Sequence, residues 1–325
     1  MSSEVDLKNR VRGALVGAVV GDAFGAPLEG ASAREIRQHV IHRARGSGPW
    51  GYTDDAAMFI ALAESIRDTG TVAPTRVLQA LTARYEPARG FGRGMKLAIR
   101  AFESGTDWSR VARAAWPEGS RGNGGAVRVG AVALRRWTGC HDLMSAAELA
   151  TRVTHAHPEA IAAALLQARL VAVALFQPEA LADPGRVVEV LAEDLPRTPF
   201  LQETLEKVRA LSSSPHDVDI ANACGTSPLA CESVIAAQVS FLRRHSSFED
   251  AVVAAASLGG DVDSICALVG CLAGALHGLS GIPERWLGAI AHESPSVREF
   301  VDLADALQEL APAEFSRERA FTFSD

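Results

Sequence analysis

The stretch GALVGAVVGDAFGAPL, residues 13–28, carries glycine at every fourth position, and ICALVGCLAGALHG, residues 265–278, repeats this spacing from residue 270 to residue 278. Glycines four residues apart lie on one face of a helix, where the missing side chains let a second helix approach closely. Both runs are shorter than the ~20 apolar residues that span a membrane, and Asp22 interrupts the first run. We therefore expect two tightly packed central helices of a soluble bundle.

Apolar residues recur at helical spacing through most of the chain. The segments expected to form helices are 7–21, 54–68, 74–85, 93–104, 125–137, 145–151, 158–176, 184–194, 199–211, 229–244, 248–257, 264–278, 283–290 and 296–310. Alternating strand patterns are nearly absent, so the sequence predicts the all-α class. The loops expected between helices are 28–52, 86–92, 116–124, 177–184, 212–228 and 312–325. None is long and polar enough to separate domains, so one domain over residues 1–325 is the simplest organisation.

Several helix starts are marked by their capping residues. Thr53 precedes a helix that opens with two acids, and Ser145 is followed three residues later by Glu148, as in a capping box. Prolines in the first turn mark three further starts, at Pro158, Pro199 and Pro283.

The composition excludes some classes of function. The net charge is -7, so no strongly basic face is expected to attract nucleic acid or anionic lipid. The chain has five cysteines and no CxxC pair, which indicates reduced thiols, no zinc site and a cytoplasmic protein. The first residues, MSSEVDLKNRVRG, lack the basic and then apolar pattern of a signal peptide. A metal cation or a local anion site remains compatible with this charge.

Two acidic motifs stand at predicted helix starts, Thr53-Asp54-Asp55 and Asp261-x-Asp263 followed by Ser264. Each motif alone has a simple explanation as a helix cap. Together they form an all-oxygen ligand set, which suits magnesium, manganese or calcium rather than zinc. If the two motifs meet, they could hold two divalent cations with one carboxylate bridging them.

Two glycine-rich loops could complement these acids. One contains Gly119, Ser120, Gly122 and Asn123 and leads into a helix, so its backbone N–H groups could cradle a phosphate. It is neither a Walker A motif nor a dinucleotide-binding fingerprint, and a merely flexible loop is the alternative. The other loop, residues 89–94, contains Phe91 as a possible stacking surface.

These motifs occur in the order found in one known family. They are GALVGAVVGDAFGAPLEG, YTDDAAM, RGFGRG, GNGGAVR, THAHPEA, GGDVDSICALVGCLAGALHG and IPERW, and they span residues 13–286. The chain thereby resembles the ADP-ribosylglycohydrolases, which include the dinitrogenase reductase-activating glycohydrolases and the ADP-ribosyl-acceptor hydrolases.

The resemblance implies a single-domain orthogonal helical bundle with two Mg²⁺ or Mn²⁺ ions, where water cleaves the bond between ADP-ribose and an acceptor. The metal ligands it implies are Thr53, Asp54, Asp55, Asp261, Asp263 and Ser264. The catalytic acids it implies are Glu29, Asp54, Asp55 and Asp263. The substrate-binding residues it implies are Gly90, Gly92, Gly94, Gly119, Ser120, Gly122, Asn123 and His155. By contrast, we expect His157 to be a structural or capping residue.

The chain departs from the family pattern at several positions. Ala56 and Ser264 stand where threonine is usual, and Val127 replaces a common methionine. Arg121 occupies an often aromatic position, which leaves the adenine-stacking side chain unassigned. Because no carboxylate is lost, we expect metal binding to be retained. The acceptor stays open among arginine, serine, a nucleobase and other ADP-ribosyl conjugates.

Other functions remain as alternatives. A non-catalytic ADP-ribose-binding or structural protein could share this fold, although all the ligand positions are filled by oxygen-bearing residues. Isoprenoid synthases use DDxxD, whereas DDAAM lacks the third acid. The dipeptide of HD-type phosphohydrolases occurs at His141 and Asp142 but without clear companions. We expect a monomer with an ADP-ribose-bearing substrate and no membrane partner.

Overall fold

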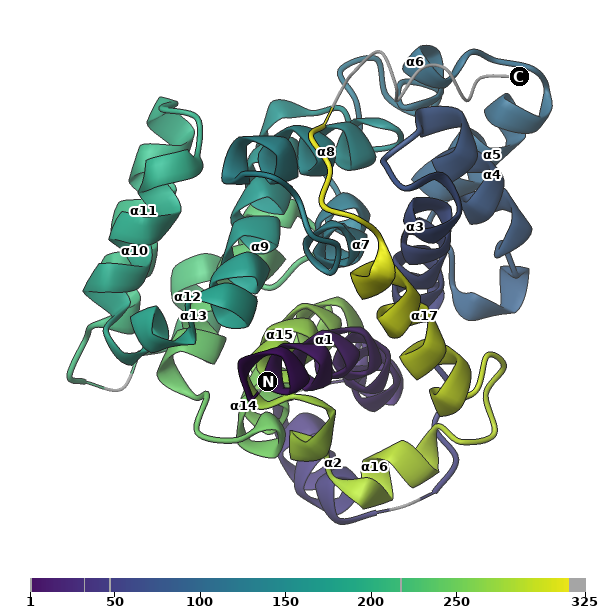
Figure 1. Cartoon of the computed structure of the whole chain (residues 1–325). Helices are drawn as coiled ribbons and strands as arrows, with labels where there is room; N and C mark the ends of the chain where they lie inside the picture. The colour runs from purple at the N-terminus through teal and green to yellow at the C-terminus, as the bar shows by residue number, and fades with distance from the viewer. Residues whose placement is uncertain (1, 32, 47, 217, 316–325) are drawn as a thin grey trace.

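The structure, a computed structural model, describes residues 2–31, 33–46, 48–216 and 218–315, and over these ranges it is built from helices with no β-strand (Figure 1). The first α-helices are α1 (Ser2–Gly25), α2 (Ala33–Arg45), α3 (Asp54–Thr69), α4 (Pro74–Ala83), α5 (Arg93–Glu103), α6 (Trp108–Val111), α7 (Gly124–Ala133) and α8 (Cys140–Arg152). They are followed by α9 (Pro158–Phe176), α10 (Pro184–Asp194), α11 (Pro199–Ser212), α12 (Ile220–Cys224), α13 (Ala230–Arg243), α14 (Phe248–Ala256), α15 (Val262–His277), α16 (Glu284–Ala289) and α17 (Val297–Glu309). Short 3₁₀ turns lie at Ala26–Leu28, Pro87–Arg89, Pro178–Ala182 and Leu279–Gly281. The predicted all-α class is confirmed.

Helices α1 and α15 form the antiparallel central pair, and their backbones touch (Figure 1). A Cβ atom added at Gly13 would lie 2.4 Å from the carbonyl oxygen of Gly274, and one added at Gly17 would lie 2.3 Å from that of Gly270. Such distances leave no room for any side chain, so the close packing predicted from the glycine spacing is confirmed.

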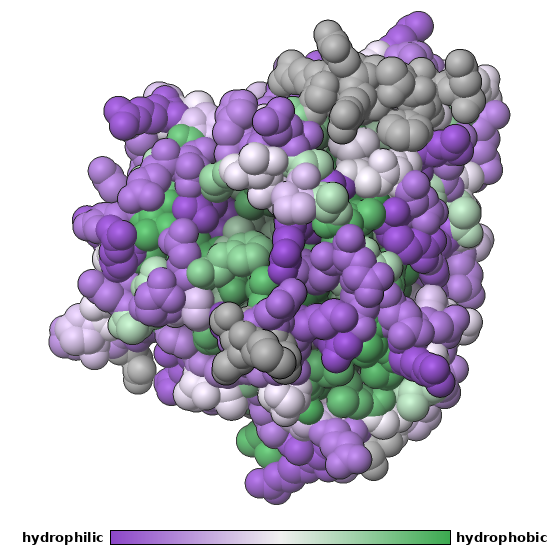
Figure 2. Space-filling view, viewed as in Figure 1, coloured by the Kyte–Doolittle hydropathy of each residue, from purple (hydrophilic) through white to green (hydrophobic). Residues whose placement is uncertain are grey.

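The remaining helices surround this pair. Helix α9 is buried on all sides, although it carries Gln167 and Arg169, and it is covered by α7, α8, α13 and α15. Helix α3 packs against α7. Segments Asp6–Leu28 and Pro158–Phe176 are long and apolar enough to cross a membrane by length and composition, but 83% and 89% of their apolar windows are buried inside the protein. This burial is the pattern of core helices. The outer face seen in Figure 2 is mostly hydrophilic, with apolar residues visible in the hollows between polar ones.

The prediction from the sequence missed three helices, α2, α6 and α12. Residues 28–52 were expected to be a loop, but they contain α2, whose apolar stripe is only Ile36, Val40 and Ala44. This stripe covers α14, and so narrow a pattern is easily overlooked among charged residues.

Of three predicted helix starts, two need correction and one is confirmed. Helix α8 begins at Cys140 after Gly139, so the predicted capping box at Ser145 is wrong. Pro283 is the N-cap of α16 rather than a first-turn residue. Thr53 caps α3 as predicted, and its side chain accepts a hydrogen bond from the backbone N–H of Asp55.

Candidate active site

The two acidic motifs come together at the N-termini of α3 and α15. The Ser264 hydroxyl donates a hydrogen bond to a carboxylate oxygen of Asp55 at 2.5 Å, which ties the two helices directly. Asp55, Asp261, Asp263 and Ser264 are all buried. The packing of α1 against α15 sets this geometry, because a Cβ atom at Gly25 would lie 2.6 Å from the Cα atom of Asp263.

Asp22 holds the start of α3 in place, a role that the sequence did not reveal. Its fully buried carboxylate accepts hydrogen bonds from the backbone N–H of Thr53 at 2.9 Å, from the Thr53 hydroxyl at 2.8 Å and from the backbone N–H of Ala56 at 2.8 Å. Asp22 therefore fixes both the helix terminus and the rotamer of Thr53. The signal available in the sequence was a single charged residue within an otherwise apolar run.

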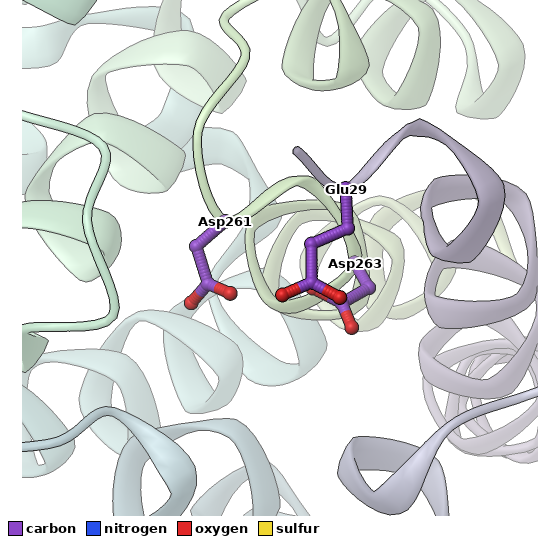
Figure 3. A group of neighbouring side chains, drawn as sticks. All are labelled: Glu29, Asp261 and Asp263. Atoms are coloured by element: carbon purple, nitrogen blue, oxygen red, sulfur yellow. The ribbon is translucent and has the colours of Figure 1, made fainter. Parts of the chain in front are cut away.

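Figure 3 shows how Glu29, Asp261 and Asp263 direct their carboxylates toward one region. One oxygen from each of the three lies within 4.8 Å of the others. Glu29 follows the turn after α1 and is exposed, whereas the two aspartates are buried at the start of α15. The cluster thus has a buried floor and a rim that solvent reaches.

Burial and mutual repulsion raise the pKa values of the carboxylates in this cluster. Burial, and then the charge of Asp263, raises the pKa of Asp54 to about 7. Burial, and then the charge of Asp261, raises the pKa of Asp263 to about 6. Burial also raises the pKa values of Asp22 and Asp55 well above the usual range. A divalent cation would reverse these shifts, since it stabilises the ionised carboxylates.

The donor set fits a hard divalent cation such as Mg²⁺ or Mn²⁺, because carboxylate and hydroxyl oxygens are the ligands these ions prefer. At the start of α15, Asp261 and Asp263 lie close enough to Asp54 and Asp55 of α3 for their charges to raise the pKa values of both, and Glu29 lies at the rim. The Ser264 hydroxyl is bonded to Asp55, and the Thr53 hydroxyl to Asp22.

Asn123 connects the glycine loop to this cluster. Its side-chain amide donates to Asp261 at 2.5 Å and to the Ser233 hydroxyl at 3.0 Å. Its backbone N–H donates to the carbonyl oxygen of Pro228 at 3.0 Å, and that of Gly122 donates to the Ser120 hydroxyl at 3.1 Å. These two N–H groups are therefore already paired within the protein. The first N–H groups of α7, from Gly124 onward, have no carbonyl partner within the helix and are better placed for an anion.

The glycine loop forms one wall of a pocket of about 660 Å³. Its lining comprises Trp116, Pro117, Glu118, Gly119, Ser120, Arg121, Gly122, His157, Pro228 and Leu229. Trp116 is 44% exposed, which is unusual for so large an apolar side chain. The Arg121 side chain forms an ion pair with Glu159. The pocket therefore offers an aromatic surface that the sequence did not single out.

The second glycine loop, residues 89–94, contacts the acidic cluster at one end and the Trp116 pocket at the other. A Cβ atom at Gly90 would lie 3.6 Å from Asp54, so this glycine borders the acidic cluster. Gly94 packs against the Trp116 ring, where a Cβ atom would come within 2.5 Å. Gly92 is the N-cap of α5. Phe91 is only 1% exposed and packs against Tyr85, so the suggestion that it is a stacking surface is wrong.

The two histidines of the THAHPEA motif differ. His155 is 6% exposed and lies behind the glycine loop, where a Cβ atom at Gly124 would be 3.2 Å from its ring. His157 caps α9, accepting a hydrogen bond from the backbone N–H of Glu159 at 3.2 Å, as expected of a capping residue.

Comparison with known proteins places these features in a family context. The family model described as ADP-ribosylglycohydrolase matches residues 3–317. ADP-ribosylhydrolase ARH3 of Gallus gallus is 28% identical, over 93% of each chain. The ADP-ribosyl-[dinitrogen reductase] glycohydrolase of Rhodospirillum rubrum is 29% identical over 93% of this chain and 97% of the relative. A solved structure described as an ADP-ribosylglycohydrolase-related protein complex superposes with a TM-score of 0.72 at 28% identity, covering 94% of this chain and 98% of that one.

Proposed function

Because the chain belongs to the ADP-ribosylglycohydrolase family, we propose that it is a metal-dependent hydrolase that cleaves the glycosidic bond between ADP-ribose and an acceptor group. The observation that supports this most strongly is that Asp55, Asp261 and Asp263 lie buried where α3 and α15 begin, with the half-buried Asp54 beside them. Unpaired carboxylates are costly to bury, so their retention together favours a working cation site over a purely structural one.

The cation-binding residues in this proposal are Thr53, Asp54, Asp55, Asp261, Asp263 and Ser264. Two divalent cations held there would orient the hydroxyls of the scissile ribose and polarise the sugar for attack by water. Glu29 stands at the exposed rim of the same cluster, where it can hold the attacking water and take its proton. Asp22 keeps Thr53 in its ligating rotamer.

The ADP portion would occupy the pocket beside the glycine loop. The N-terminus of α7 suits the diphosphate, because backbone N–H groups and the helix dipole both favour an anion. We assign the adenine to the exposed face of Trp116, which takes the place of the aromatic residue missing at Arg121. Asn123, through its bond to Asp261, links this pocket to the carboxylate cluster.

The proposal is tested by incubating the protein with peptides ADP-ribosylated on arginine or on serine, and with an ADP-ribosylated nucleobase, in Mg²⁺, Mn²⁺ or EDTA. We expect release of ADP-ribose from at least one substrate only with a divalent cation, and a loss of more than about a hundredfold in Asp263→Asn. Asp302→Asn, the same change on the exposed face of α17, is the matched control. Full activity in Asp263→Asn would refute the metal mechanism, and binding of ADP-ribose without cleavage of any substrate would favour a binding protein.

A further inference from the structure

Arg128 is a fully buried cation on α7, directly behind the glycine loop. It donates hydrogen bonds to the carbonyl oxygens of Gly124 at 3.3 Å and Ala150 at 2.8 Å and to the Thr154 hydroxyl at 2.7 Å. Within the described ranges, Arg128 forms no ion pair with a carboxylate. A buried charge satisfied only by neutral oxygens is costly, so its presence here calls for a reason.

The Thr154 hydroxyl lies between Arg128 and His155 and is within hydrogen-bond distance of both. Its oxygen accepts a hydrogen bond from Arg128 and lies 2.8 Å from Nδ1 of His155. Because a guanidinium can only donate, the hydroxyl proton of Thr154 is left for another acceptor. Among the described residues, Nδ1 of His155 is the acceptor within reach. This direction of hydrogen bonding makes Nδ1 an acceptor and leaves the imidazole proton on Nε2.

The other ring nitrogen, Nε2 of His155, faces the glycine loop. A Cβ atom at Gly124 would lie 3.4 Å from it, and one at Gly122 would lie 3.6 Å from it. Nε2 has no hydrogen-bond partner in the part of the chain that the structure describes, although the residue is only 6% exposed. Burial, and then the charge of Arg128, lowers the pKa of His155 to about 3, so the ring is neutral at ordinary pH.

We propose that Arg128 and Thr154 are positioning residues: they fix His155, which the family resemblance already implies as a substrate-binding residue, as a neutral imidazole with its proton on Nε2, so that this N–H is ready to donate to a diphosphate oxygen held at the glycine loop. The inference rests on the proposed function, because it takes ADP-ribose as the ligand. Fixing the tautomer in advance removes the chance that Nδ1 carries the proton and Nε2 repels the anion. The unpaired charge of Arg128 also attracts the diphosphate from within a poorly screened interior.

The decisive variants are Thr154→Val, which removes the hydroxyl while keeping the shape, and Thr154→Ser, which restores it. The nitrogen NMR shifts of the His155 ring report the tautomer, and calorimetry reports the affinities for ADP-ribose and for adenosine, which lacks the diphosphate. We expect the Nε2–H tautomer in the wild type and in Thr154→Ser. Thr154→Val is expected to bind ADP-ribose about tenfold more weakly, with adenosine binding unchanged.

Three results would overturn the inference: an Nδ1–H tautomer in the wild type, wild-type affinity for ADP-ribose in Thr154→Val, or an equal loss for ADP-ribose and adenosine. Arg128→Gln should also give mixed tautomers, and if that variant fails to fold, Thr154→Val still decides. Failure of the wild type to bind ADP-ribose would refute the proposed function and the ligand part of the inference, whereas the nitrogen shifts would still decide whether Thr154 fixes the ring.

Discussion

Asp263→Asn is predicted to stabilise the metal-free protein while destroying its response to metal. Asp263 is the group whose charge raises the pKa values of Asp54, Asp55 and Asp22 in addition to the effect of burial. Asparagine has nearly the same shape, and its side-chain oxygen can still accept the hydrogen bond that the backbone N–H of Ser264 donates at 2.9 Å. The substitution therefore removes mainly the repulsion between charges, together with one of the proposed cation ligands.

The size of the effect follows from the geometry. Oxygens of Asp261 and Asp263 lie within 4.8 Å of each other, and two charges at that separation repel by roughly 3 kcal/mol at an effective dielectric constant of about 20. Solvent and partial protonation reduce this value, so we expect a gain of about 1–2 kcal/mol in the free energy of unfolding, or roughly 2–3 °C in Tm. Magnesium at a hundred times its Kd would stabilise the wild type by about 2.7 kcal/mol, or roughly 4 °C.

The gain should depend on pH with a definite sign. In the metal-free folded protein the pKa of Asp263 is raised from 3.8 to about 6. A group with a raised folded-state pKa favours folding below its unfolded pKa, and this contribution is lost as the pH rises through the folded value. The advantage of Asp263→Asn over the wild type should therefore be small near pH 4 and grow through about pH 6.

Differential scanning calorimetry in EDTA and in Mg²⁺, at about pH 4.5 and pH 8, measures all these quantities. The control is Asp302→Asn, which should follow the wild type in every condition. The reasoning is refuted if metal-free Asp263→Asn melts below the wild type at the higher pH, or if Mg²⁺ raises its Tm as much as it raises that of the wild type.

Two further predictions concern the pocket lined by Trp116 and the central helices. In steady-state kinetics, Trp116→Ala should raise KM about tenfold with little change in kcat, because base stacking contributes about 1–3 kcal/mol. Trp116→Phe should stay near the wild type. Equal KM values for Trp116→Ala and the wild type would exclude stacking on this residue. Gly270→Ala would place a Cβ atom 2.2 Å from the carbonyl oxygen of Gly17. Its free energy of unfolding, measured with urea, should fall by about 3 kcal/mol or more. Gly288→Ala, whose Cβ atom would meet nothing within 4 Å, should be tolerated. Equal stabilities of the two alanine variants would contradict the packing argument.

The sequence predicts the centre of the fold well, because backbone contact between two helices demands glycine on both. The glycines at Gly17 and Gly270 lie where the two helix backbones touch, and neither position has room for a side chain. That the two acidic motifs meet is left conditional by the residues themselves, and it is implied by the family resemblance, which places both motifs at one metal centre. Helix α2 escaped detection because its buried stripe is one residue wide, at Ile36, Val40 and Ala44.

Two parts of the site could not be predicted, for a different physical reason. The three hydrogen bonds accepted by Asp22 join residues 31 and 34 positions apart, and no local pattern specifies such a distance. Trp116 lies in a loop without periodicity, so its exposure depends on the tertiary packing against Gly94. Long-range partners of this kind become visible only in the folded chain.

The glycine stripe and the carboxylate cluster are parts of a single arrangement. Contacts along the antiparallel pair run from Gly13 with Gly274, through Gly21 with Cys266, to Gly25 with Asp263. The last of these contacts brings the end of α1 against the start of α15. The same helix packing therefore places Asp22 and Glu29 close to Asp263. A side chain at any of these glycines would push the helices apart and move the acids with them. We therefore expect the separation of the carboxylates to be as sensitive to the small residues along the stripe as to the acids themselves.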